Sequence, residues 1–392
     1  MQSIVSGGFS CQDGSPGEEK RLGFRNYQNL MVLGCVSALI GCTTWTERRE
    51  EELRVLDGSK LTSSNGLARV KIPLTSADHA VMLEAIPPSG FQAFVAKVED
   101  SEGNLLRDYT EDLQRSRQRT GAASASNAVF FNYPTGDDDP PLSGEELVVS
   151  IAAVDSADTL NSNVRLDVAA YLKSDTDLEN GEMYVKLYFA GMTASDEGIR
   201  TAVTTAAEIW RDIASDFGVT LSIETEDWQE GALPKPGTGA PDEFEAISSQ
   251  APLRTVNVVV VPSVLGSEEI LGATGSVPGP VSPSGYSAVV ISAAANAGPD
   301  LEFSEDEVQL LAETMAHETG HYLGLFHPVE STWDKWDAIS DTVECNDRDV
   351  CEDELGNNLM FPYPVCDEVA CQMQDSLTVS QKALIHRYAG MR

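Results

Sequence analysis

Basic residues are scarce in this chain of 392 residues: 26 Lys and Arg stand against 62 Asp and Glu, which gives a formal net charge of −36 at pH 7. Such a surface repels the phosphates of nucleic acids and the headgroups of anionic lipids. We therefore expect no nucleic-acid partner and no direct binding of the folded body to a lipid surface. The acidic excess is typical of a solvated coat, with attraction of divalent cations as the alternative.

Long apolar segments are also absent, and the uncharged run near the N-terminus, Leu30–Gly41, is too short to cross a bilayer. Its length suits the apolar core of a secretory signal, and basic residues precede it. The ending Leu39-Ile40-Gly41-Cys42 resembles a bacterial lipobox, which implies cleavage before Cys42 and a lipid on its thiol. We predict that residues 1–42 are a signal peptide and that the chain is exported. Cys42 would then anchor it in the cell envelope, whereas an ordinary cleaved signal would leave it secreted.

Cysteine is rare as well, and none lies between Cys42 and Cys345. A thiolate from this long interval is therefore excluded as a ligand that could block a metal site. Four cysteines remain near the C-terminus: Cys345, Cys351, Cys366 and Cys371. An even set in an exported chain predicts two disulfides, with three pairings open. A zinc site of four thiolates is the alternative, but the spacings lack the usual pair of CxxC knuckles.

The N-terminal part of the exported chain changes in composition near residue 65. Residues 43–64 are polar and charge-rich, which predicts a tether or a short exposed helix. Between 65 and 178, short β-prone stretches alternate with turns rich in Gly, Pro, Asn and Asp, a pattern typical of an antiparallel β-sandwich accessory domain. The predicted strands are Ala68–Leu74, Phe91–Val98, Val129–Tyr133, Leu147–Ala153 and Val164–Leu172.

Residues 179–392 mix strands and helices and contain no internal repeat. A helix is predicted from about Ser195, because apolar residues from Ile199 to Ile213 recur at helical spacing. A loop rich in Gly, Pro and Ser spans Gly272–Gly285. The predicted strands are Met183–Phe189, Val219–Glu224, Thr255–Val261 and Ser287–Ser292. This part is therefore expected to be an α+β domain.

The most informative stretch runs from His317 to His327 and contains three of the only five histidines, in the pattern HExxHxxGxxH. Upstream, Ser304 and Glu307 have the spacing of a capping box, which predicts the start of a helix. At 3.6 residues per turn, His317 and His321 lie on one face of that helix, where two imidazoles bind one metal ion.

Gly324 suits the end of this helix, because glycine adopts the left-handed conformation that other residues resist. The chain can then turn back and bring His327 to the metal as a third ligand. Three nitrogen ligands leave a fourth position open, which is the arrangement of a catalytic zinc site. Glu318 follows the first ligand and is suited to act as the general base toward water at the metal and then as the acid toward the departing amine.

These residues resemble the metzincin clan of zinc peptidases, and within it most closely the pappalysin family. The stretch Asn358–Pro362 looks like the tight turn of that clan, and Met360 would then form an apolar floor beneath the metal without being a ligand. Pappalysins carry a tyrosine two residues after this methionine, where it assists the oxyanion. Here Pro362 occupies that place, so the resemblance assigns the role to Tyr363.

The resemblance implies three further features. It pairs the cysteines as Cys345–Cys366 and Cys351–Cys371. It also identifies Asp341-Thr342 with a stretch that helps to hold a structural Ca²⁺ ion, and Ser287–Ser292 with the edge strand above the cleft, which pairs with an extended substrate.

The sequence thus predicts an α+β protein in which an antiparallel β-sandwich precedes a metzincin-like zincin catalytic domain, residues 179–392. The expected activity is zinc-dependent hydrolysis of extracellular proteins or peptides. A serralysin-type peptidase is one alternative, since Pro328 follows the third histidine, but the calcium-binding glycine repeats of that family are absent. A surface adhesin that retains zinc without turnover is another, although Glu318 is present. An envelope scaffold is the third.

Overall fold

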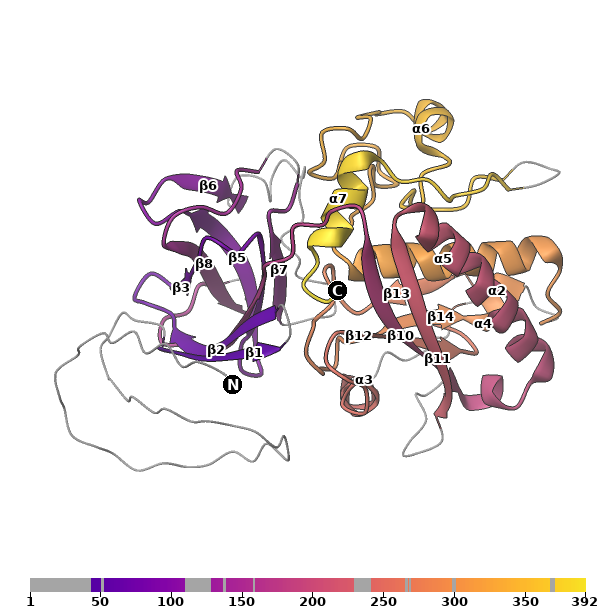
Figure 1. The fold of residues 1–392 in the computed structure, drawn as a ribbon, viewed down its shortest axis with the longest axis horizontal. Helices are drawn as coiled ribbons and strands as arrows, with labels where there is room; N and C mark the ends of the chain where they lie inside the picture. The colour runs from indigo at the N-terminus through magenta and orange to yellow at the C-terminus, as the bar shows by residue number, and fades with distance from the viewer. Residues whose placement is uncertain are drawn as a thin grey trace, which may run out of the picture.

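The computed structural model contains an N-terminal half built from strands and a C-terminal half of mixed strands and helices, and the two lie next to each other (Figure 1). The predicted signal peptide and Cys42 lie outside the described residues. The structure describes residues 44–50, 53–109, 128–136, 139–157, 159–228, 241–264, 267, 269–297, 301–366 and 371–392.

The N-terminal half is built from two sheets in which every strand pairing is antiparallel. The first sheet has the order β1 (Thr44–Glu50), β2 (Leu53–Leu61), β9 (Arg165–Lys173), β4 (Ala80–Ile86), β7 (Val129–Tyr133). The second has the order β3 (Leu67–Pro73), β8 (Glu146–Asp155), β5 (Phe91–Glu99), β6 (Leu105–Asp108). Apolar residues from both sheets form one buried cluster, as in a β-sandwich. The five strands predicted here are confirmed.

The prediction of a polar tether over 43–64 is wrong for most of that range. Strands β1 and β2 form an antiparallel pair within the first sheet. Leu53, Val55 and Leu56 on β2 are buried, whereas β1 is an edge strand with exposed side chains such as Glu47 and Arg49. The charged composition of β1 therefore reflects a solvated sheet edge, and composition alone does not distinguish such an edge from a tether.

The C-terminal half contains a five-stranded sheet and six helices among the described residues. The sheet has the order β11 (Val219–Trp228), β10 (Gly181–Ala190), β12 (Thr255–Val261), β14 (Val289–Ser292), β13 (Gly272–Thr274). The helices are α2 (Glu197–Asp216), α3 (Pro241–Ser248), α4 (Ala293–Ala297), α5 (Glu305–Tyr322), α6 (Arg348–Leu355) and α7 (Val379–Arg387), and a short 3-10 turn, η1, covers Gly191–Ala194. The observed elements fit the predicted α+β class, while the division into domains at residue 179 stays a prediction.

The edge of this sheet differs from the prediction. Strands β10, β11, β12 and β14 are parallel, and β13 pairs antiparallel with β14. The edge strand is therefore β13 and not Ser287–Ser292. The three residues of β13 lie at the start of the loop Gly272–Gly285, and a segment so short and glycine-rich carries no strand signal of its own.

Helices α2 and α5 pack against each other and against the parallel sheet (Figure 1). Their buried cluster also includes residues of the first sandwich sheet, such as Val55, Met82, Phe130 and Tyr171. One apolar core thus continues from the sandwich into the C-terminal half. Among the described residues, no helix has the length and hydropathy needed to span a membrane.

Candidate metal centre

Helix α5 brings the first two histidines together. Its predicted capping box is present: the Ser304 side chain accepts from the Glu307 amide, and the Glu307 side chain accepts from the Ser304 amide. The helix ends at Tyr322, and Gly324 has a φ of +106°, a conformation that strongly favours glycine. The Leu325 amide then donates to the Gly320 carbonyl at 3.0 Å, which turns the chain back toward the helix.

The turn brings His327 to the other two histidines, as predicted. The Nε2 atom of His327 lies 3.1 Å from Nε2 of His321 and 3.3 Å from Nε2 of His317. Zn–N bonds of about 2.05 Å at tetrahedral angles place ligand nitrogens about 3.3 Å apart, so these separations match a zinc site. All three side chains are partly buried, and the ligand atoms lie within 4.8 Å of one another.

The other ring nitrogen of each histidine contacts an oxygen atom. Nδ1 of His317 donates to the Leu359 carbonyl at 2.6 Å, and Nδ1 of His321 donates to the Leu325 carbonyl at 2.7 Å. Nδ1 of His327 lies 3.3 Å from the Glu330 carboxylate. Protons on the three Nδ1 atoms leave all three Nε2 lone pairs pointing at one place. Three converging lone pairs repel one another, and a cation between them removes that repulsion.

The charge state of His317 agrees with metal binding. Burial, together with the neighbouring His327, lowers the pKa of His317 to about 3, so its imidazole is neutral at physiological pH. Neutral imidazole is the form that binds a metal ion. The residues present therefore fit a zinc ion. Sequence reasoning missed Glu330, although a carboxylate three residues after a ligand histidine is a signal that could have identified it.

Glu318 is buried beside the histidines, and strand β13 covers it. The Thr274 hydroxyl lies 2.6 Å from the carbonyl oxygen of Glu318 and 2.9 Å from its Oε2. The Thr274 hydroxyl donates to both oxygens and so holds the Glu318 side chain against its own backbone. A methyl group built on Gly272 would lie 2.6 Å from Cγ of Glu318. Burial raises the pKa of Glu318 to about 7, against the lowering effect of the hydrogen bond to Thr274.

Met360 lies fully buried against α5, while its role as an apolar floor beneath the metal stays a prediction. Its sulfur would be 2.5 Å from a methyl group built on Gly320, which lies between the two ligand histidines of the helix. The Asn358 side chain accepts from the Met360 amide at 2.9 Å and so holds the turn. Because this turn also carries the Leu359 carbonyl, one tight turn supports the helix and orients His317.

Tyr363, to which the resemblance assigns oxyanion assistance, is held by other groups. Its hydroxyl donates to Glu352 of α6 at 2.9 Å, and its ring packs on Phe361 and Trp333. None of the hydrogen bonds found among the described residues links Tyr363 to the three histidines. Its catalytic role stays a prediction.

The predicted disulfide pairing is wrong. The bonds are Cys345–Cys351 and Cys366–Cys371, with Cα atoms 5.4 Å and 3.8 Å apart. Cys351 lies in the first turn of α6, which places it next to Cys345, and the other two residues face each other across an antiparallel bridge. Local turns therefore bring each cysteine within bonding distance of its sequence neighbour. Two disulfides indicate an oxidising environment outside the cytoplasm.

Calcium at Asp341-Thr342 has no support in the structure. The Thr342 hydroxyl donates to Asp337 at 2.6 Å, and the Asp341 carboxylate accepts from the Ser380 amide at 3.0 Å. In the described part of the chain, the histidine triad is the only set of His, Cys, Asp or Glu side chains found to converge as metal ligands.

Comparisons with known proteins give little beyond this geometry. No protein-family model matches the sequence, and no curated protein matches it. Among solved structures, metalloproteinase-II from Bacteroides fragilis is similar at 12% identity over 73% of this chain and 77% of its own, with a TM-score of 0.27. A structure described as "CBM4 structure and function" is similar at 10% identity over 34% of this chain and 74% of its own, with a TM-score of 0.14. Similarities this low carry no argument about function, and they leave membership of the pappalysin family unshown.

Proposed function

We propose that this chain is an exported zinc-dependent endopeptidase that hydrolyses proteins or peptides outside the cytoplasm. The observation that carries the proposal is the convergence of three Nε2 lone pairs beside a buried carboxyl group. A structural zinc site has four protein ligands, whereas three histidines leave one position for a reactant. The identity of the metal is part of the proposal, and it rests on the nitrogen ligands and their spacing.

The residues of the site divide the reaction between them. Bound zinc would supply a Lewis acid that polarises the scissile carbonyl and lowers the pKa of water. Glu318 removes a proton from the attacking water and transfers it to the departing amine. The Thr274 hydroxyl donates to the Glu318 carboxyl group and to the Glu318 carbonyl. Thr274 therefore holds the carboxyl group in a fixed orientation for these proton transfers.

Strand β13 offers a way to align the substrate. It is the last strand of the sheet, and its residues are partly exposed. An extended peptide that adds to this edge would receive main-chain hydrogen bonds and would pass next to Glu318, which touches Gly272. Side chains of the substrate do not form these bonds, so this mode of alignment suits many sequences.

Export and anchoring belong to the same proposal. The two disulfides require an oxidising compartment, and the run that ends at Cys42 resembles a lipobox. We propose that the mature chain begins at Cys42 and contacts the membrane only through the lipid on that residue. The excess of 36 negative charges keeps the folded body away from anionic surfaces.

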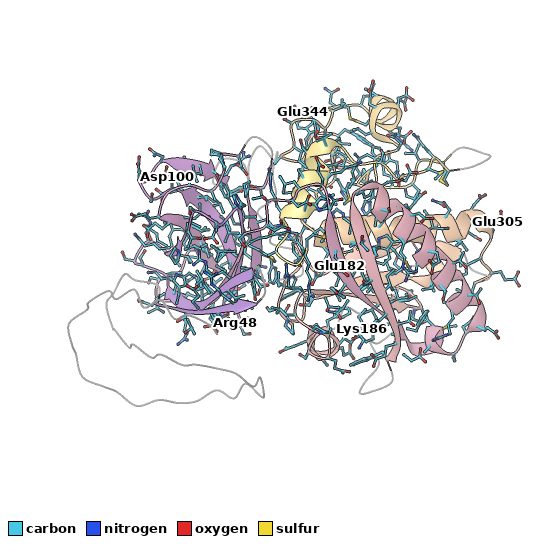
Figure 2. The ribbon with its side chains drawn as sticks, in the orientation of Figure 1. Arg48, Asp100, Glu182, Lys186, Glu305 and Glu344 are labelled. Atoms are coloured by element: carbon cyan, nitrogen blue, oxygen red, sulfur yellow. A yellow bond between two sulfur atoms is a disulfide. The ribbon has the colours of Figure 1, made fainter. Side chains whose placement is uncertain are left out.

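The test compares the wild type with Glu318→Ala and with Glu305→Ala as a matched control. Glu305 lies at the opposite end of the same helix and is exposed to solvent (Figure 2). Each protein is assayed for bound zinc by elemental analysis and for cleavage of casein, with and without a chelator. We expect about one zinc in all three, with cleavage by the wild type and Glu305→Ala only. Zinc in all three and cleavage by none would favour the binding-protein alternative, and a wild type without stoichiometric zinc would contradict the metal site.

A further inference from the structure

The interface between the sandwich and the C-terminal half contains a buried acid, Glu84 of β4. Only 3% of its surface is exposed. Its carboxyl accepts from the Val281 amide at 2.8 Å, from the Ser282 hydroxyl at 2.8 Å and from the Ser282 amide at 3.4 Å. The Tyr171 hydroxyl of β9 donates to it at 3.3 Å. A buried carboxyl group is costly unless it is hydrogen-bonded, and here three of the four donors come from the C-terminal half.

The segment that Glu84 holds is joined to the histidine helix. The Gly279 amide donates to the Tyr322 carbonyl at 2.8 Å, and the Tyr322 hydroxyl donates to the Pro280 carbonyl at 2.6 Å. Tyr322 is fully buried, and its ring lies so close to Gly279 that a methyl group there would overlap it. Tyr322 directly follows the ligand His321. Val281 donates to Glu84, and the preceding residue, Pro280, accepts from Tyr322. These two adjacent residues therefore connect the acid of the sandwich to the end of the metal-binding helix.

A second contact reaches the turn after that helix. Asn132 of β7 is 5% exposed, and a methyl group built on Gly324 would lie 2.7 Å from its Nδ2. Both polar atoms of the Asn132 side chain lack a hydrogen-bond partner among the described residues, which is a costly state for a buried amide. The turn that it covers carries the Leu325 carbonyl, the acceptor for His321 Nδ1, and leads to His327.

We propose that the sandwich gives structural support to the metal centre. Glu84 and Asn132 are the positioning residues, and they hold Tyr322 and the Leu323–Leu325 turn in place. None of the hydrogen bonds found in the described part of the chain links Glu84 or Asn132 to the three histidines. Glu84 holds the segment at Val281 and Ser282 by hydrogen bonds, and Asn132 packs against Gly324. Together they support the backbone that orients His321 and leads to His327, so that the three imidazoles are preorganised before a metal ion binds. The inference rests on the proposed metal site, but it concerns metal affinity and does not require peptidase activity.

The test uses the full exported chain and Co²⁺, whose visible absorption reports ligand geometry. Dissociation constants for Co²⁺ and Zn²⁺ are measured by chelator competition for the wild type, Glu84→Ala, Glu84→Gln and Asn132→Ala. Val149→Ala is the matched control, because Val149 is fully buried in the sandwich core away from this surface. All measurements are made well below the melting temperature of each variant, so that folded protein is compared with folded protein.

We expect Glu84→Ala and Asn132→Ala to raise both dissociation constants about threefold to thirtyfold and to alter the Co²⁺ spectrum. Glu84→Gln keeps an acceptor for the Val281 amide and should restore values near those of the wild type. Val149→Ala should lower the melting temperature without changing metal affinity. Unchanged affinity and spectra in both alanine variants would overturn the proposal. A wild type that binds neither metal would instead contradict the proposed function.

Discussion

Gly272→Ala tests how closely β13 fixes the position of Glu318. The new methyl carbon would lie 2.6 Å from Cγ of Glu318, 3.1 Å from its Oε1 and 3.1 Å from a methyl carbon of Thr314. Carbon atoms in contact prefer separations of about 3.5 Å or more, so the Glu318 side chain must move by about 1 Å. The hydrogen bond from the Thr274 hydroxyl to Oε2 of Glu318 is disturbed as a result.

A displacement of about 1 Å in a catalytic group costs about a hundredfold in rate, or about 2.7 kcal/mol of transition-state stabilisation. We therefore expect kcat/KM for an unstructured protein substrate to fall about a hundredfold in Gly272→Ala, with zinc content unchanged. Gly198→Ala is the matched control, because Gly198 lies in the first turn of α2. Among the described residues, and apart from the backbone of the helix itself, the only atom within 4 Å of a new methyl group there is a carboxyl oxygen of Asp196 at 3.2 Å. Full activity of Gly272→Ala would refute the view that β13 positions the base.

Three further changes test other parts of the structure. Glu330→Ala removes the oxygen near Nδ1 of His327 and should raise the zinc dissociation constant about tenfold to a hundredfold in a chelator titration; an unchanged constant would contradict this role. Thr319→Val replaces a buried hydroxyl that has no partner among the described residues and lines an apolar cavity. The free energy of unfolding, measured with urea, should therefore rise by about 1 kcal/mol. A decrease would mean that the hydroxyl is hydrogen-bonded. Burial raises the pKa of Glu84 from 4.5 to about 7; the folded state then binds more protons than the unfolded state between these values, and stability falls as the pH rises through this window. The free energy of unfolding, measured with urea, should therefore fall less between pH 5 and pH 8 in Glu84→Gln than in the wild type, by up to about 3 kcal/mol. Equal decreases in the two proteins would contradict the raised pKa of Glu84.

The strand and helix predictions succeeded where a local pattern decides the structure. Val129–Tyr133 and Thr255–Val261 are β-branched or aromatic runs, and they coincide with β7 and β12. The capping box at Ser304 fixed the start of α5 within one residue. The charged segment 44–50 and the short strand 272–274 were missed, because their strand pairing depends on a neighbour and not on their own composition.

The sequence by itself determined that the three histidines lie close enough together to bind one metal ion. Two histidines lie four residues apart on a helix, a glycine ends that helix, and a third histidine follows three residues later. The helical repeat and one left-handed turn therefore restrict the relative positions of the three side chains. Only the tertiary structure decided that the Leu359 carbonyl contacts Nδ1 of His317 and that Glu84 joins the sandwich to the segment beside Tyr322. These contacts link residues up to about two hundred positions apart, or depend on turns whose direction is set by packing. Spacing along the chain cannot encode such contacts, because they arise only when separate elements share one core.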